Sequence, residues 1–79
     1  MKIQVKLFAN FRDYLPPGSD KFTCWVELEE GATIGRVLEK LKIPECIPMI
    51  TLVDGIHRAT EEPLHPGEVL SVFPPVAGG

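Results

Sequence analysis

The last strand-like segment of the chain runs directly into two prolines and then a short ending that contains two glycines. Residues 69–73 form an alternating, mostly apolar run that predicts a β-strand. Pro74 and Pro75 must end that strand, because proline donates no hydrogen bond to a ladder and fixes its own φ. We therefore predict a folded domain over residues 1–73 and a flexible tail over residues 74–79 that presents the Gly79 carboxylate.

Three earlier segments also have the pattern of strands. Apolar and polar residues alternate over residues 2–8 and again over 21–28, and residues 48–53 form an apolar stretch. Asp54-Gly55 follows this stretch and is the strongest short hairpin pattern in the chain. It predicts a return strand over residues 56–60. Trp25 falls on the face opposite the apolar residues of its strand, where it is either half covered or exposed.

One amphipathic helix is predicted between the second and third strands. Its apolar residues have the spacing i, i+3, i+4, i+7 and are Ile34, Val37, Leu38 and Leu41. Thr33 is suited to cap the first turn, and Pro44 limits the helix at its other end. Upstream, residues 9–20 predict a connection with some helical character, in which Phe11, Tyr14 and Leu15 cap one end of the core.

The order of these elements is strand, strand, helix and then three strands, which predicts an α+β fold with one helix covering a mixed five-stranded sheet. A helical crossover requires a parallel pair of strands, and right-handed connection limits where that pair lies. We place the first and last strands side by side and parallel at the centre. This is the β-grasp arrangement of ubiquitin-like domains, and it leaves the tail projecting from one end of the central strand.

Charge and composition exclude several classes of protein. The net charge is −3, and the acidic residues are spread along the chain, which disfavours nucleic acid or an anionic membrane and suits a partner with a basic docking face. No run approaches the ~20 apolar residues needed to span a bilayer. Cys24 and Cys46 are too few for a disulfide scaffold, so we expect a reduced, cytoplasmic setting.

The sequence contains no pattern typical of a bound cofactor or metal. It lacks a phosphate-binding loop and a dinucleotide fingerprint, and no Cys/His spacing resembles a zinc site. A nucleophile pair of Cys46 with His57 or His65 stays open, although no third orienting group is evident. We expect no cofactor to be bound and no independent enzymatic activity.

The tail residues have properties that suit insertion into a narrow channel. Gly78 and Gly79 lack Cβ atoms, so the backbone at these residues can enter a channel that is too narrow for side chains. Pro74 and Pro75 stiffen the start of the tail, which reduces the entropy lost on insertion. Apolar anchoring comes from Phe73 and Val76, and Ala77 is small enough to follow the glycines.

Five segments resemble the MoaD/ThiS family of ubiquitin-like sulfur carrier proteins, and together they span nearly the whole chain. These segments are residues 5–12, 30–34, 53–55, 64–69 and 73–79. The last of them, Phe-Pro-Pro-Val-Ala-Gly-Gly, is most similar to the ending of the molybdopterin synthase small subunit. Thiazole-forming relatives usually keep the two glycines without the double proline.

The resemblance implies a function carried by Gly79. A ubiquitin-activating-like adenylyltransferase would adenylate its carboxylate with ATP, and the adenylate would become a thiocarboxylate. A larger synthase subunit would then accept the partner-binding tail, Phe73 to Gly78, and the sulfur would enter molybdopterin. The alternatives are a sulfur carrier for thiazole or cysteine synthesis, a protein modifier joined to lysines through Gly79, and a binding module whose tail is idle.

Overall fold

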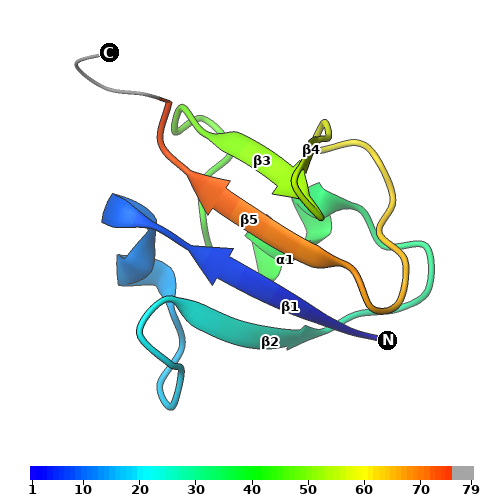
Figure 1. Cartoon of the computed structure of the whole chain (residues 1–79), viewed down its shortest axis with the longest axis horizontal. Coiled ribbons are helices and arrows are strands. Elements are labelled where there is room, and N and C mark those ends of the chain that lie inside the picture. Colours follow the sequence, from blue (N-terminus) through cyan, green and yellow to red (C-terminus); the bar gives the residue numbers. More distant parts are fainter. Residues whose placement is uncertain (76–79) are drawn as a thin grey trace.

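One five-stranded sheet organises the part of the chain that the structure describes, residues 1–75 of a computed structural model (Figure 1). The strands are β1 (Lys2–Leu7), β2 (Thr23–Glu27), β3 (Ile50–Val53), β4 (Ile56–His57) and β5 (Val69–Phe73). The helices are the 3₁₀ helix η1 (Ala9–Tyr14) and the α-helix α1 (Ile34–Lys40). No helix among residues 1–75 is long and apolar enough to cross a bilayer.

The strands lie in the order β2-β1-β5-β3-β4, so the first and last strands of the chain are neighbours. β1 and β5 are parallel, with Val5 opposite Leu70 and Leu7 opposite Val72. The pairs β1–β2, β3–β5 and β3–β4 are antiparallel. The α+β class and the β-grasp arrangement predicted from the element order are therefore confirmed.

The core fills the space between the sheet and α1, which covers one face only (Figure 1). The period of two in β1 directs Ile3, Val5 and Leu7 toward the helix, and all three are fully buried. From α1, Ile34, Val37 and Leu38 are buried against them, as the helical spacing predicts. Phe11 of η1 is also fully buried, while Tyr14 and Leu15 pack at the edge of the core. We call the opposite side of the sheet the open face.

Local hydrogen bonds explain where α1 begins and ends. The Thr33 hydroxyl accepts a bond of 3.2 Å from the Arg36 N–H, which confirms the predicted cap. At the other end, the Ile43 N–H donates to the Leu38 carbonyl at 2.8 Å. This Schellman-type closure requires a left-handed residue, and Lys42 supplies it at φ 62°. The helix therefore ends before Pro44 is reached.

The return strand of the hairpin is shorter than predicted. Asp54 and Gly55 adopt positive φ angles of 50° and 84°, as the turn pattern requires, but β4 ends at His57 instead of continuing to residue 60. The Glu62 carboxylate accepts bonds from the Ala59 N–H and the Arg58 guanidinium, both at 2.9 Å. Arg58 itself is still bonded to β3, since its N–H donates to the Thr51 carbonyl at 3.1 Å and its carbonyl accepts from the Thr51 hydroxyl at 2.6 Å. The Glu62 contacts hold the chain in a turn directly after this point.

Candidate functional site

The predicted site lies where β5 ends. Because β1 and β5 are parallel, both strands finish at the same end of the sheet, next to η1 (Figure 1). Phe73 is the last residue of β5 and pairs with Ile50 of β3. Pro74 and Pro75 follow outside the strand, which confirms the expected end of the ladder. We call this region the carboxyl end of the sheet.

The rest of the predicted site lies outside the described residues. Val76, Ala77, Gly78 and Gly79 are not described by the structure. The flexible tail over residues 74–79, the boundary at residue 73 and the reactive Gly79 carboxylate therefore remain predictions.

Three phenylalanine rings meet at the carboxyl end of the sheet, and we call them the aromatic cluster. The rings of Phe8 and Phe22 stack with centroids 5.2 Å apart. The rings of Phe8 and Phe73 meet edge to face with centroids 6.1 Å apart. Both distances lie in the range of favourable aromatic pairs. Phe22 is 37% exposed and the other two rings are half-buried, so the cluster forms part of the molecular surface.

The backbone explains why these rings gather. Residue 8 continues β1 in an extended conformation, and its N–H donates to the Val72 carbonyl at 3.0 Å. Side chains alternate along a strand, so Phe8 and Phe73 point to the open face while Leu7 and Val72 point to the core. The Leu7 N–H donates to the Phe22 carbonyl at 2.7 Å, which brings the third ring alongside.

The aromatic cluster was only partly visible in the sequence. Phe73 was expected to contribute to docking, but Phe8 was not singled out. The alternation over residues 21–28 predicts Phe22 on the same buried face as Cys24 and Val26. This prediction is wrong, because β2 begins only at Thr23 and Phe22 stacks on Phe8 instead. The sequence does contain one indication of the cluster: Phe8 follows the first strand directly, and Phe22 directly precedes the second.

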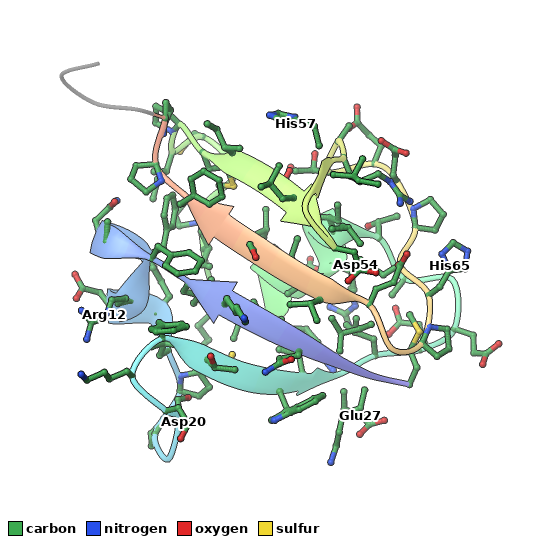
Figure 2. All side chains as sticks on the ribbon, viewed as in Figure 1. Arg12, Asp20, Glu27, Asp54, His57 and His65 are labelled. Carbon is green, nitrogen blue, oxygen red and sulfur yellow. The ribbon has the colours of Figure 1, made fainter. Side chains whose placement is uncertain are left out.

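Three cationic residues belong to the same end of the molecule as the aromatic cluster. Lys6 lies on the open face beside Ser71 and Thr23, and Lys21 precedes Phe22 in the chain. Arg12 of η1 donates from Nε to the Lys21 carbonyl at 3.1 Å, and Figure 2 shows it at this end of the molecule. None of the ion pairs formed within residues 1–75 involves any of the three.

In contrast to these three cations, the arginines elsewhere in the described chain form ion pairs. The Arg36 guanidinium contacts Glu39 at 2.8 Å and Glu29 at 3.2 Å, and Arg58 contacts Glu62 at 2.9 Å. The bond from the Ala59 N–H, followed by Arg58, lowers the pKa of the Glu62 carboxyl. The arginines distant from the aromatic cluster are thus already paired with carboxylates.

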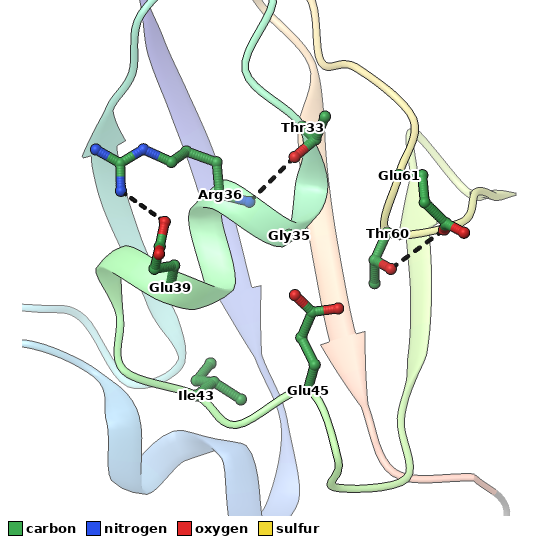
Figure 3. A pocket seen from close by; sticks show the side chains of 8 residues that line it. All are labelled: Thr33, Gly35, Arg36, Glu39, Ile43, Glu45, Thr60 and Glu61. Atoms are coloured by element: carbon green, nitrogen blue, oxygen red, sulfur yellow. Dashed lines mark hydrogen bonds and ion pairs between the residues drawn. The ribbon is translucent and has the colours of Figure 1, made fainter.

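A hollow with a volume of about 580 Å³ lies beside α1 (Figure 3). It is lined by Thr33, Gly35, Arg36, Glu39, Ile43, Glu45, Thr60 and Glu61. Three of these side chains are carboxylates, and Arg36 is held by ion pairs. Such a lining disfavours the phosphate groups of a nucleotide.

The thiol and imidazole groups do not form an evident catalytic or metal-binding centre in the described part of the chain. Cys24 is buried, and burial raises the pKa of its thiol, which makes it a poor nucleophile. Cys46 is exposed, as are His57 and His65. Within residues 1–75, no group of three or more His, Cys, Asp or Glu side chains is arranged to hold a metal ion.

Comparison with solved structures places this geometry among ubiquitin-like proteins. A putative molybdopterin converting factor subunit 1 from Pyrococcus furiosus is 31% identical, with a TM-score of 0.75 over 95% of this chain and 98% of that one. The small archaeal modifier protein 1 of Haloferax volcanii is 26% identical, with the same TM-score and coverage. The expected resemblance to the molybdopterin synthase small subunit is thus confirmed.

A third structure agrees in fold alone. Subunit 1 in the complex of subunits 1 and 2 of the Helicobacter pylori molybdopterin-converting factor has a TM-score of 0.64 at 19% identity, over the full length of both chains. No curated protein matches this chain. The family model described as Mut7-C ubiquitin matches residues 1–78, so the chain belongs to the Mut7-C ubiquitin family.

Proposed function

We propose that this protein is a ubiquitin-like sulfur carrier whose Gly79 carboxylate is adenylated by a partner and then converted to a thiocarboxylate. The observation that carries the proposal is the course of the chain at the end of β5. The central strand runs directly into Pro74 and Pro75, and the sequence then continues to Gly78-Gly79. The 31% identity to a molybdopterin converting factor subunit 1 supports the same function.

The chemistry begins with activation, because a carboxylate is a poor electrophile. An oxygen of the Gly79 carboxylate attacks the α-phosphorus of ATP, the bond to the β-phosphate breaks, and pyrophosphate leaves. Hydrosulfide, supplied by a sulfur donor, then attacks the carbonyl carbon. The bond to AMP breaks, AMP leaves, and the carboxylate has exchanged one oxygen for sulfur.

Both steps require that water be excluded, since the adenylate would otherwise hydrolyse. We propose that the partner encloses Gly78 and Gly79 in a narrow channel, which is why side chains are absent there. The six residues after Phe73 reach at most roughly 20 Å when extended at ~3.3–3.6 Å each, enough to cross such a channel. The need for ATP places these steps in the cytoplasm.

Two partners follow from the proposal. The first is an adenylyltransferase of the ubiquitin-activating kind, which binds the ATP. The second is a larger synthase subunit that accepts the charged tail, by analogy with the Helicobacter pylori complex of subunits 1 and 2. The double proline favours molybdopterin over thiazole or cysteine as the destination of the sulfur.

A second function is favoured by a specific observation. The Haloferax volcanii structure of similar fold, at 26% identity, is a small archaeal modifier protein. A modifier shares the adenylation step but then joins its terminal carboxylate to a lysine of a target. The two functions therefore differ only in what finally attacks the carbonyl carbon.

Mass spectrometry of the intact protein, co-expressed with its adenylyltransferase and a sulfur donor, tests the proposal. We expect a species in which one oxygen of Gly79 is replaced by sulfur. A variant lacking Gly78 and Gly79 should fold equally well and yield no such species. Lysine-linked conjugates without the thiocarboxylate would support the modifier instead. If the wild-type chain with its correct partner yields neither the thiocarboxylate nor conjugates, both functions are contradicted.

A further inference from the structure

We propose that this protein pairs with a second copy of itself along the free edge of β2, so that the five-stranded sheets of the two copies become continuous, with Trp25 of each copy at the centre of the contact. This interaction surface is distinct from the site at the end of β5, and the inference does not depend on the proposed function. Three observations carry it: the open backbone groups of β2, the exposure of Trp25, and the fit of this strand to its own copy.

The sheet has two edge strands, and β2 offers the greater length of strand to a partner. β4, at the other edge, has two residues, whereas β2 has five and pairs with β1 in unbroken register. Natural proteins protect an edge strand by keeping it short or by interrupting it with proline or a bulge. Thr23–Glu27 has none of these devices, so it is the edge that favours the addition of another strand.

The backbone of β2 turns alternate residues toward this free edge. The Leu7 N–H donates to the Phe22 carbonyl at 2.7 Å, which identifies the even-numbered residues as those bonded to β1. Thr23, Trp25 and Glu27 therefore direct their N–H and C=O groups away from the sheet. Within residues 1–75, no group bonds to the N–H groups of these three residues or to the Trp25 carbonyl. The middle of the edge is thus open for pairing.

The two outer carbonyls of the edge are already engaged, and they mark its length. The Asp20 N–H donates to the Thr23 carbonyl at 3.0 Å, and Lys40 Nζ donates to the Glu27 carbonyl at 2.6 Å. A carbonyl oxygen has two lone pairs, so each of them still has one for a second strand. The strand ends at both places, and the pairing window is therefore residues 23–27, with Trp25 at its centre.

Self-pairing over this window has one full-length register. A two-fold axis makes the two copies of the strand antiparallel, and pairing all five residues places Trp25 opposite Trp25 and Thr23 opposite Glu27. These are the residues whose backbone groups point outward, so they form the hydrogen-bonded pairs of the new ladder. Cys24 lies opposite Val26 between them, and both are apolar and buried in the single copy. Every outward backbone group of the window is then bonded.

The side chains on the joined open faces are complementary as well. Trp25 is 60% exposed, and in this register its ring meets the same ring of the other copy across Cα atoms about 5.5 Å apart. Lys6 lies beside Thr23, so the Glu27 carboxylate of the other copy approaches Lys6 from across Thr23. Lys6 forms no ion pair within residues 1–75, and the two-fold axis provides this charge contact twice.

The surroundings of the edge leave room for the second strand. A hollow of about 270 Å³ separates the loop at residues 16–20 from the edge at residues 23–25, where the chain after Glu27 of the other copy would pass. Figure 1 shows no segment of the described chain beside the middle of β2 on its outer side. A contact between five-residue strands is small, and interfaces below about 1,200 Å² are weak. We therefore expect a dimer that forms and dissociates with concentration.

The test is sedimentation equilibrium of the full-length protein in the Cys46→Ser background, from about 10 μM to about 1 mM, where a monomer–dimer equilibrium is expected. Trp25→Asp places two like charges at the centre of the contact and should raise the dissociation constant about 100-fold or more. Ile56→Asp makes the same charge change at an exposed apolar residue of β4 and should change it by less than about threefold. Thermal unfolding verifies that both variants are folded.

Two further measurements locate the contact. Trp25 is the single tryptophan of the chain, so its emission should shift to shorter wavelength as the dimer forms, in wild type and Ile56→Asp alike. Thr23→Cys and Glu27→Cys chains, mixed in the Cys46→Ser background under mild oxidation, should form a disulfide-linked heterodimer. Opposite residues of such a pair have Cα atoms about 5.5 Å apart, within the range of a disulfide. Neither chain alone should be cross-linked, because each introduced thiol then lies far from its copy.

Several results would overturn the proposal. A protein that stays monomeric up to about 1 mM would refute self-pairing and leave the edge to an extended segment of a different protein. A dimer that is unaffected by Trp25→Asp, or that is lost in Ile56→Asp, would place the contact elsewhere. Cross-linking of Thr23→Cys or Glu27→Cys alone, without the heterodimer, would refute the register. The adenylation of Gly79 is independent of all these outcomes.

Discussion

The two faces of the sheet are built for different purposes. On the side covered by α1, apolar side chains are fully buried, and the nearby Arg36 and Arg58 are paired with carboxylates. At the carboxyl end of the open face, phenylalanine rings remain partly exposed and Arg12 forms no ion pair within residues 1–75. The difference separates the residues that stabilise the fold from those available for recognition, and substitutions of one residue type on the two sides should therefore have different effects.

The largest expected effect comes from the covered side. Phe11 is fully buried, so Phe11→Ala should lower the free energy of unfolding by about 3–5 kcal/mol, through lost burial and the cavity left behind. A domain of this size has little stability to spare, and the variant is expected to be partly unfolded at 37 °C. Urea denaturation followed by circular dichroism measures the change.

The matched substitution on the open face should cost much less stability. Phe22 is 37% exposed and its main contact is the ring of Phe8, so Phe22→Ala should lower the free energy of unfolding by about 0.5–1.5 kcal/mol. Equal losses of stability for Phe11→Ala and Phe22→Ala would remove the distinction between the two regions.

A gain of stability is expected at the end of α1. Lys42 has φ 62°, a left-handed conformation that glycine adopts at much lower cost, so Lys42→Gly should raise the free energy of unfolding by about 1 kcal/mol. Lys40→Gly, at the last residue of α1, serves as the control and should lower stability, because glycine is a poor helix former and the bond from Lys40 Nζ to the Glu27 carbonyl at 2.6 Å is lost. The KM for adenylation should be unchanged in Lys42→Gly, and a large change would link this turn to recognition.

A smaller effect is expected from acid. The pKa of Glu62 is lowered in the folded state, chiefly by the Ala59 N–H, from an ordinary value of 4.5. This carboxylate therefore contributes stability at pH values above 4.5, and the contribution is lost as the pH falls through the folded pKa. In thermal unfolding, Glu62→Gln should lower the Tm at pH 7 and reduce its decline between pH 5 and pH 3 relative to wild type. An unchanged pH profile would show that the Glu62 contacts do not stabilise the fold.

Patterns that depend on neighbouring residues were predicted well from the sequence. The cap at Thr33, the turn at Asp54-Gly55 and the buried stripe of α1 each follow from residues within one or two turns of chain. The parallel pairing of β1 and β5 also followed, because the helical crossover leaves few topologies.

Features that depend on contacts between distant segments were missed. The strand β4 ends at His57, and the side chains of Thr51 and Glu62 bond the residues that follow it. The sequence left Trp25 open as half covered or exposed; its side chain is 60% exposed, because no segment among residues 1–75 covers it. The aromatic cluster combines three separate parts of the chain, and no periodicity relates them.

The most direct test of the central claim is ATP–pyrophosphate exchange by the cognate adenylyltransferase in the presence of this protein. We predict exchange that depends on the full-length chain and disappears when Gly78 and Gly79 are deleted, while the Tm of the deleted variant stays unchanged. Exchange that persists at the wild-type rate without these two glycines would show that the terminal carboxylate is not the group that is activated.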